Sequence, residues 1–111
     1  MKKVICSILA PEAIGPYSQA IEVNGMIFTS GQIPLDPRTG EIVGATIEEQ
    51  TERVMQNLKA VLAQAGVGFD HVVKTTCFLA DLADFAAFNA AYGKYFPENP
   101  PARSCFQVAA L

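Results

Sequence analysis

The segment of residues 46–65 constrains the fold most, because its pattern predicts one long amphipathic helix. Its apolar residues recur at helical spacing on a single stripe: Ile47, Val54, Met55, Leu58, Val61, Leu62 and Ala65. Thr46 and Glu49 form a capping-box pattern, in which the threonine side chain accepts one free N–H and the glutamate reaches back to another. Gly66 is placed to end the helix. A helix about 30 Å long with one apolar face needs a sheet to cover.

Strands for that sheet are predicted around a hairpin. Residues 19–23 and 26–30 flank Asn24-Gly25, a dipeptide that type I′ turns favour because both central residues need a positive φ. Further strands are expected over residues 4–8, 71–79 and 103–111, and a second helix over residues 82–96, opened by Asp81 or Asp84. The order β-β-β-α-β-α-β predicts an α+β two-layer sandwich, a mixed sheet with two helices on one face.

The composition suggests that apolar surface is buried between subunits. The chain has 111 residues, which is one domain's length, and it is 50% hydrophobic but only 17% charged. The usual charged share is about 25%. A small domain has little interior for so many apolar side chains, so we expect an oligomer. An Ala-rich core within one subunit is the alternative.

Charge and cysteine content exclude several classes of protein. The net charge is −3 with no basic run, which is unlike a chain that neutralises nucleic-acid phosphates. Apolar runs fall far short of the roughly 20 residues of a membrane span, and the N-terminus is no secretory signal. Cys6, Cys77 and Cys105 are widely spaced without a CxxC, as expected of reduced thiols in the cytoplasm. With His71 as the single histidine, no zinc site is expected.

Arg103 is the first candidate for a functional side chain. It follows the rigid segment 100–102 and begins a strand that is otherwise uncharged. An arginine there loses hydration unless it finds an anion, and its planar fork suits a carboxylate. An ion pair with a local acidic residue, or simple exposure, is the alternative. Cys105 is expected to be a buried, unreactive thiol rather than a nucleophile, and His71 a surface histidine rather than a base.

Two turns place small or hydroxyl-bearing residues close together. They are Gly15-Pro16-Tyr17-Ser18 and Thr29-Ser30-Gly31-Gln32. Glycines at such turns let backbone N–H groups approach a ligand. Ordinary turn chemistry explains both segments equally well.

Five separated blocks carry a resemblance to a known family. They are AIGPYSQA at residues 13–20, SGQIP at 30–34, VVKTT at 72–76, PARSC at 101–105 and QVAAL at 107–111. In this order, and over essentially the whole chain, they resemble the Rid family of reactive intermediate (enamine/imine) deaminases, also called the YjgF or L-PSP family. The resemblance implies a chorismate-mutase-like α+β fold and a homotrimer with clefts between neighbouring subunits.

The resemblance also implies an activity. It is the hydrolysis of 2-aminoacrylate, 2-iminobutyrate and similar imines to 2-keto acids and ammonia, without cofactor or metal. The partners would be small 2-imino and 2-keto carboxylates, with no nucleic acid and no membrane. Arg103 would grip the substrate carboxylate, Tyr17 would reach into the site as a second catalytic residue, and Cys105 would line it with its backbone N–H and C=O. Substrate-binding positions would also include Ser30, Gly31, Phe85 and Asn89, although core packing explains Phe85 equally well.

The chain departs from the family pattern at its C-terminus. Family members continue past the Val-Ala-Ala-Leu stretch with a last strand, whose glutamate is thought to position the water. Because this chain stops at Leu111, we expect a single Rid-like domain over residues 1–111 that lacks this strand and is part of a longer native chain. Pro100 also replaces the aromatic residue common before Pro-Ala-Arg.

Two further functions are weighed against deaminase activity. The missing glutamate favours a non-catalytic sensor that binds 2-keto acids or other small carboxylates without turnover. The older family interpretation is an endoribonuclease or translation inhibitor. The chain has no basic stripe and no histidine pair for acid–base cleavage, so its composition disfavours that interpretation.

Overall fold

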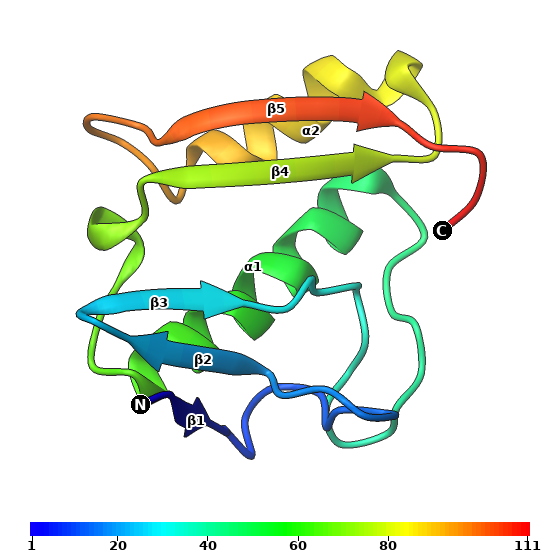
Figure 1. The fold of residues 1–111 in the computed structure, drawn as a ribbon. Helices are drawn as coiled ribbons and strands as arrows, with labels where there is room; N and C mark the ends of the chain where they lie inside the picture. The colour runs from blue at the N-terminus through cyan, green and yellow to red at the C-terminus, as the bar shows by residue number, and fades with distance from the viewer.

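The computed structural model describes all residues, 1–111. The elements in order are β1 (Lys3–Ile5), β2 (Ala20–Val23), β3 (Met26–Thr29), α1 (Ile47–Gln64), β4 (Lys74–Leu79), α2 (Phe85–Gly93) and β5 (Ala102–Gln107) (Figure 1). Two short 3₁₀ helices, η1 (Phe69–His71) and η2 (Leu82–Asp84), precede β4 and α2. The order predicted from the sequence is therefore confirmed.

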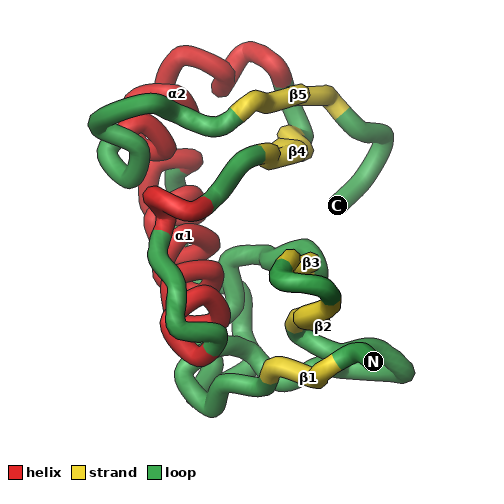
Figure 2. The backbone as a smooth tube through the Cα atoms, turned by 60° about the vertical axis from the view of Figure 1, so that its left-hand side comes forward, coloured by secondary structure: helices red, strands yellow, loops and turns green.

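The strands form two sheets, so the prediction of one continuous mixed sheet is wrong. β1, β2 and β3 pair antiparallel in that order, and β4 and β5 form a separate parallel pair. No backbone hydrogen bonds of a sheet join β3 to β4. The chain leaves β3 into the long connection 30–46, and β4 pairs only with β5. η2 and α2 supply the crossover that parallel strands need. Both helices lie on the same side of the two sheets, as expected of an α+β fold (Figure 2).

α1 begins and ends where its caps predict. The Thr46 hydroxyl oxygen accepts the Glu49 N–H at 3.2 Å. The Thr46 hydroxyl also donates to the Glu49 carboxylate at 3.0 Å, and this side-chain bond replaces the expected return bond to the backbone. At the other end Gly66 has φ +82, a left-handed conformation that glycine adopts without strain. The N–H groups of Gly66 and Val67 then bond back to the last helical turn at 3.0 Å.

The β2–β3 hairpin turns at Asn24-Gly25 as expected. Asn24 has φ 51 and Gly25 has φ 75, the two positive values that a type I′ turn requires. Val23 pairs with Met26 directly across the turn. The local sequence signal is thus sufficient to set the register of this hairpin.

The second helix is shorter than predicted. Asp81 caps η2 by accepting the Ala83 N–H at 2.9 Å, and regular helix extends only over Phe85–Gly93. Beyond Gly93 the backbone tightens into turn bonds, with the Phe96 N–H donating to the Gly93 carbonyl at 3.1 Å. Glycine disfavours helix, which explains the early end.

Packing leaves many apolar side chains uncovered. One core cluster joins α1, β4 and α2 through Met55, Leu79, Phe88, Tyr92 and Phe96. A second joins β1, β2 and α1 through Ile5, Ala10, Ala20 and Val61. Outside them, the sheet strands expose Val4, Met26, Phe28, Phe78 and Phe106, each by more than half of its surface. No helix has the combination of length and apolar character needed to cross a bilayer.

Candidate functional site

Arg103 lies on β5 and packs against one face of α2. Its Nη1 donates to the Asn89 side-chain oxygen at 2.7 Å. The guanidinium carbon lies 5.1 Å from the ring centre of Tyr92, 5.4 Å from that of Phe85 and 6.0 Å from that of Phe88. Aromatic faces attract a cation without neutralising it. The guanidinium is thus held in place by neutral partners.

No acidic side chain pairs with Arg103. The ion pairs within 4.0 Å in the chain are Arg38–Asp36 and His71–Asp70. The alternative that Arg103 serves a local structural ion pair is therefore wrong. The Asn89 side chain accepts a hydrogen bond from one terminal nitrogen of the Arg103 guanidinium. The other N–H groups of the guanidinium can donate to another acceptor.

An open pocket of about 460 Å³ lies beside this guanidinium. Its lining consists of Leu82 and Phe85 at the start of the second helical segment, and Arg103 and Cys105 on β5. The pocket thus combines one cation with apolar walls. That combination suits a small organic anion, whose charged group would meet Arg103 and whose carbon skeleton would meet the apolar side chains.

Cys105 is less enclosed than the sequence predicts. It is half-buried and lines the pocket, so the expected burial of this thiol is only partial, because the open wall beside Arg103 leaves one side uncovered. Cys77 is its register partner on β4 and is also a half-buried free thiol. Burial raises the pKa of the Cys77 thiol above its usual value, because the charged form loses hydration.

Tyr92 connects the guanidinium to the neighbouring strand, a role that the sequence analysis missed. Its hydroxyl bonds the Thr75 hydroxyl at 2.7 Å, and Thr75 is the register partner of Arg103. Burial raises the pKa of Tyr92, so its ring faces the cation as a neutral phenol. The spacing of Phe85, Asn89 and Tyr92 could have predicted this contact, since residues at i, i+4 and i+7 share one helix face.

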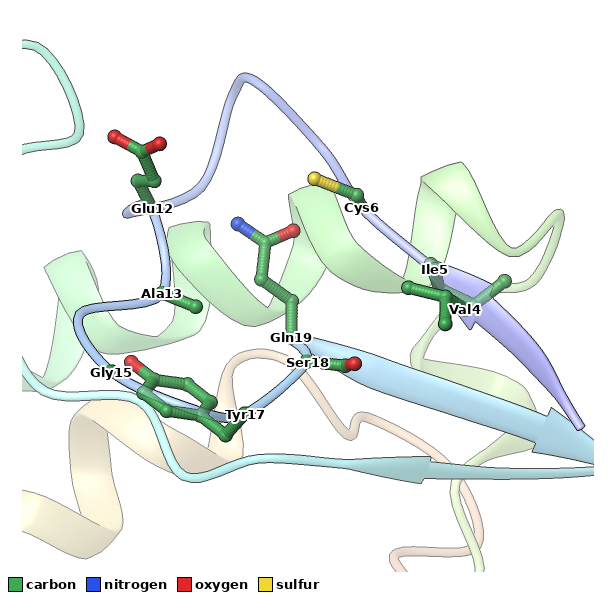
Figure 3. Close-up of a pocket in the computed structure, with 9 residues that line it drawn as sticks. All are labelled: Val4, Ile5, Cys6, Glu12, Ala13, Gly15, Tyr17, Ser18 and Gln19. Atoms are coloured by element: carbon green, nitrogen blue, oxygen red, sulfur yellow. The ribbon is translucent and has the colours of Figure 1, made fainter.

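Tyr17 lies in a different pocket from Arg103 within this chain. That pocket measures about 270 Å³ and is formed by β1 and the loop that leads into β2. Tyr17 is half exposed, and its hydroxyl accepts the Ile14 N–H at 3.4 Å. Figure 3 shows the ring lying along its own loop near Ala13 and Gly15. One chain alone does not bring Tyr17 and Arg103 together.

Ser30 and Gly31 follow the hairpin beside the Tyr17 loop. The Ser30 hydroxyl donates to the Ser18 carbonyl at 2.6 Å, and its N–H donates to the Gln19 carbonyl at 2.9 Å. Gln19 is buried, and its side-chain oxygen accepts the Ser7 N–H at 2.6 Å. The hydrogen bonds of Ser30 therefore connect the turn at residues 15–18 to the turn at residues 29–32. Gly31 is exposed, and an added Cβ there would meet nothing within 4 Å.

Asn57 organises the connection that follows Gly31, and the sequence analysis missed it too. Its side chain is fully buried, and its amide donates to the carbonyls of Ile33 and Leu35 at 3.2 and 2.9 Å. Its oxygen accepts from the Arg53 guanidinium at 3.1 and 2.8 Å. The available signal was its spacing, because Asn57 lies three residues after Val54 and four before Val61 and so shares a helix face with both.

His71 is exposed and pairs with Asp70 at 3.1 Å, so the expectation of a surface histidine is confirmed. Nowhere in the chain do three His, Cys, Asp or Glu side chains gather in a way that could hold a metal ion.

Comparison with known proteins identifies the family and supports the fold. A family model described as Endoribonuclease L-PSP matches residues 7–111. The Reactive Intermediate Deaminase A, chloroplastic, of Arabidopsis thaliana is 51% identical over 110 residues, covering 99% of this chain and 59% of that protein. A Rid family protein, YyfA from Yersinia pestis, superposes with TM-score 0.97 at 48% identity, covering 100% of this chain and 87% of the other. Escherichia coli TdcF with bound serine gives TM-score 0.93 at 44% identity, covering 98% and 87%.

Fold and site together define a small α+β protein with a cationic, apolar-walled pocket between its last strand and second helix. The chain belongs to the Rid family, also called the YjgF or L-PSP family. The resemblance drawn from its sequence blocks is confirmed.

Proposed function

We propose that this protein hydrolyses reactive 2-enamine and 2-imino acids, such as 2-aminoacrylate and 2-iminobutyrate, to 2-keto acids and ammonia. The observation that carries the proposal is Arg103, a cation without an acidic partner in an apolar-walled pocket. These substrates offer a carboxylate and a short carbon skeleton, which match the two parts of the pocket. One relative is named a reactive intermediate deaminase, and one structural neighbour holds serine, another small carboxylate.

The reaction requires few catalytic groups from the protein. A protonated 2-imino acid is already electrophilic at its imine carbon, so the site must hold it and admit one water. Arg103 grips the carboxylate through N–H groups that Asn89 leaves free. Cys105 lines the pocket, and we assign to its backbone N–H and C=O the contact with the substrate that the family resemblance implies. Water adds to the carbon of the C=N bond, a proton passes to nitrogen, and ammonia leaves as the carbonyl forms.

We propose further that the working form is a homotrimer in which Tyr17, Ser30 and Gly31 of one copy approach the Arg103 pocket of its neighbour. Two observations support this. Tyr17 and Arg103 line different pockets of one chain. The sheets also expose large apolar side chains, Phe28, Phe78 and Phe106 among them, which a second copy could cover. The free cysteines support a reducing compartment, so we place the activity in the cytoplasm.

An imine-diversion assay tests the proposal. A serine dehydratase generates 2-aminoacrylate, semicarbazide traps what survives, and the fraction that escapes as pyruvate is followed with and without this protein. We expect the protein to divert the imine to pyruvate. If the folded protein diverts none, the enzyme proposal fails.

The same preparation separates the alternatives. Binding of 2-ketobutyrate without any turnover would select the non-catalytic sensor. A ribonuclease activity that co-purifies with the chain and disappears in Arg103→Ala would revive the endoribonuclease interpretation.

A further inference from the structure

Cys77 and Cys105 are direct neighbours across the β4–β5 pair, and the proposed reaction uses neither thiol. They are register partners, so their side chains point to the same side of the sheet. Both pack against the core cluster between β4 and α2. Adjacent strands lie about 4.8 Å apart, inside the range of about 4.4–6.8 Å that Cα atoms of a disulfide span. The Cα spacing of paired strands therefore falls within the range that a disulfide spans.

The surroundings of the two thiols differ in a way that assigns them different roles. Cys105 lines the open pocket together with Arg103, so a small solute can reach it. Cys77 does not line the pocket. Burial raises the pKa of its thiol, which keeps it protonated and slow to react by itself. Cys105 is thus suited to meet an oxidant first, and Cys77 to complete the bridge.

We propose that Cys77 and Cys105 form a peroxide-oxidisable pair that closes into a disulfide at the wall of the pocket. The Cys105 sulfur attacks one peroxide oxygen and the O–O bond breaks, so that Cys105 becomes a sulfenic acid while the departing hydroxide and the thiol proton of Cys105 form water. The Cys77 sulfur then attacks the Cys105 sulfur. The S–S bond forms as the S–O bond breaks, and the second water leaves with the Cys77 proton. Two thiols are oxidised as one hydrogen peroxide is reduced to two waters.

Cys6 provides the matched control. It is an exposed thiol on the segment after β1 and lines the pocket that holds Tyr17, away from the β4–β5 pair. Replacing it in a Cys6→Ser background leaves only the proposed pair. Any disulfide within one chain of that background then has to join Cys77 to Cys105.

The test treats the folded Cys6→Ser protein with one equivalent of hydrogen peroxide, followed by thiol counting and intact-mass and peptide analysis. We expect loss of both thiols, loss of two hydrogen atoms in mass, no added oxygen, and a peptide linking Cys77 to Cys105. Adding Cys77→Ser should stop the reaction at a Cys105 sulfenic acid that dimedone captures. Adding Cys105→Ser should leave the Cys77 thiol intact over the same time.

Oxygen added to each cysteine without a link, or links found only between chains, would overturn the proposal. So would equal reactivity of the Cys77 thiol in the Cys105→Ser protein. Circular dichroism melts of each variant establish that it is folded before oxidation. None of these readouts depends on imine hydrolysis, so the pair can be judged even if the proposed activity fails.

Discussion

Asn89 holds Arg103 through a hydrogen bond of 2.7 Å between its side-chain oxygen and Nη1, and it does so without contributing charge. The family resemblance implies that Asn89 borders the substrate. In the structure its oxygen is instead engaged by the arginine that we propose as the carboxylate anchor. For the proposed reaction we therefore expect Asn89 to be a positioning residue, because a neutral amide orients the guanidinium while leaving its charge for the ligand.

The neutrality of Asn89 leads to a first prediction. Asn89→Asp places a carboxylate where the amide oxygen lies, so it should pair with Arg103 and compete with the ligand. Affinity for 2-ketobutyrate, measured by titration calorimetry, should fall by about tenfold or more. Asn89→Ala removes the positioning bond but adds no charge, so its loss should be smaller. Equal affinity in wild type and Asn89→Asp would contradict this role for Asn89.

A second prediction concerns Asn57. Asn57→Ala leaves the carbonyls of Ile33 and Leu35 and the Arg53 guanidinium without their partner. The free energy of unfolding should fall by about 3 kcal/mol, since buried polar groups are costly when unpaired. Urea unfolding measures the change. Lys59→Ala, an exposed position on the same helix, should leave the midpoint nearly unchanged. If Asn57→Ala and Lys59→Ala had equal urea midpoints, the hydrogen bonds of Asn57 would contribute nothing to stability.

A third prediction concerns pH. The Tyr95 hydroxyl donates to the Glu52 carboxylate, and this bond lowers the pKa of Glu52 below its usual value. A lowered folded pKa stabilises the protein above the unfolded pKa, and that stability is lost as pH falls through the folded pKa. The stability advantage of wild type over Tyr95→Phe should therefore shrink from about pH 6 to about pH 3.

The Tyr95→Phe variant is a fair comparison, because it keeps the ring that packs against Phe69 at 5.2 Å. Urea titrations at several pH values report the difference between the two proteins. A difference that stays constant over the whole range would mean that Glu52 does not take part.

A fourth prediction tests the proposed trimer. The rings of Phe78 and Phe106 stack 6.4 Å apart on the exposed side of β4 and β5. If copies cover this side, Phe106→Asp buries an unpaired charge there and should shift the mass measured by light scattering from trimer to monomer. Lys94→Asp changes charge at the exposed end of α2 and should leave the mass unchanged. A monomeric wild-type protein would refute the trimer outright.

What the sequence predicted correctly was encoded locally. Thr46 and Gly66 specify the ends of α1, and Asn24-Gly25 specifies the hairpin, through bonds that span a few residues. Arg103 stood out because its flanking strand is uncharged. These signals need no knowledge of distant parts of the chain.

What the sequence did not predict depends on contacts between distant segments. The separation into two sheets follows from which strands meet, which no local pattern states. The bond between Tyr92 and Thr75 joins residues 17 positions apart, and Asn57 reaches a connection more than 20 positions away. The exposure of Cys105 depends on what α2 leaves uncovered beside β5.

The most direct test of the account measures kcat/KM for 2-iminobutyrate, generated in situ, in wild type, Arg103→Ala and Arg38→Ala. Arg38 is an exposed arginine paired with Asp36, so it controls for loss of one cationic side chain. We predict that Arg103→Ala loses about a hundredfold or more, because the substrate carboxylate loses its charged anchor, while Arg38→Ala keeps the wild-type value. Wild-type kcat/KM in folded Arg103→Ala would contradict the assignment of the pocket as the site of imine hydrolysis.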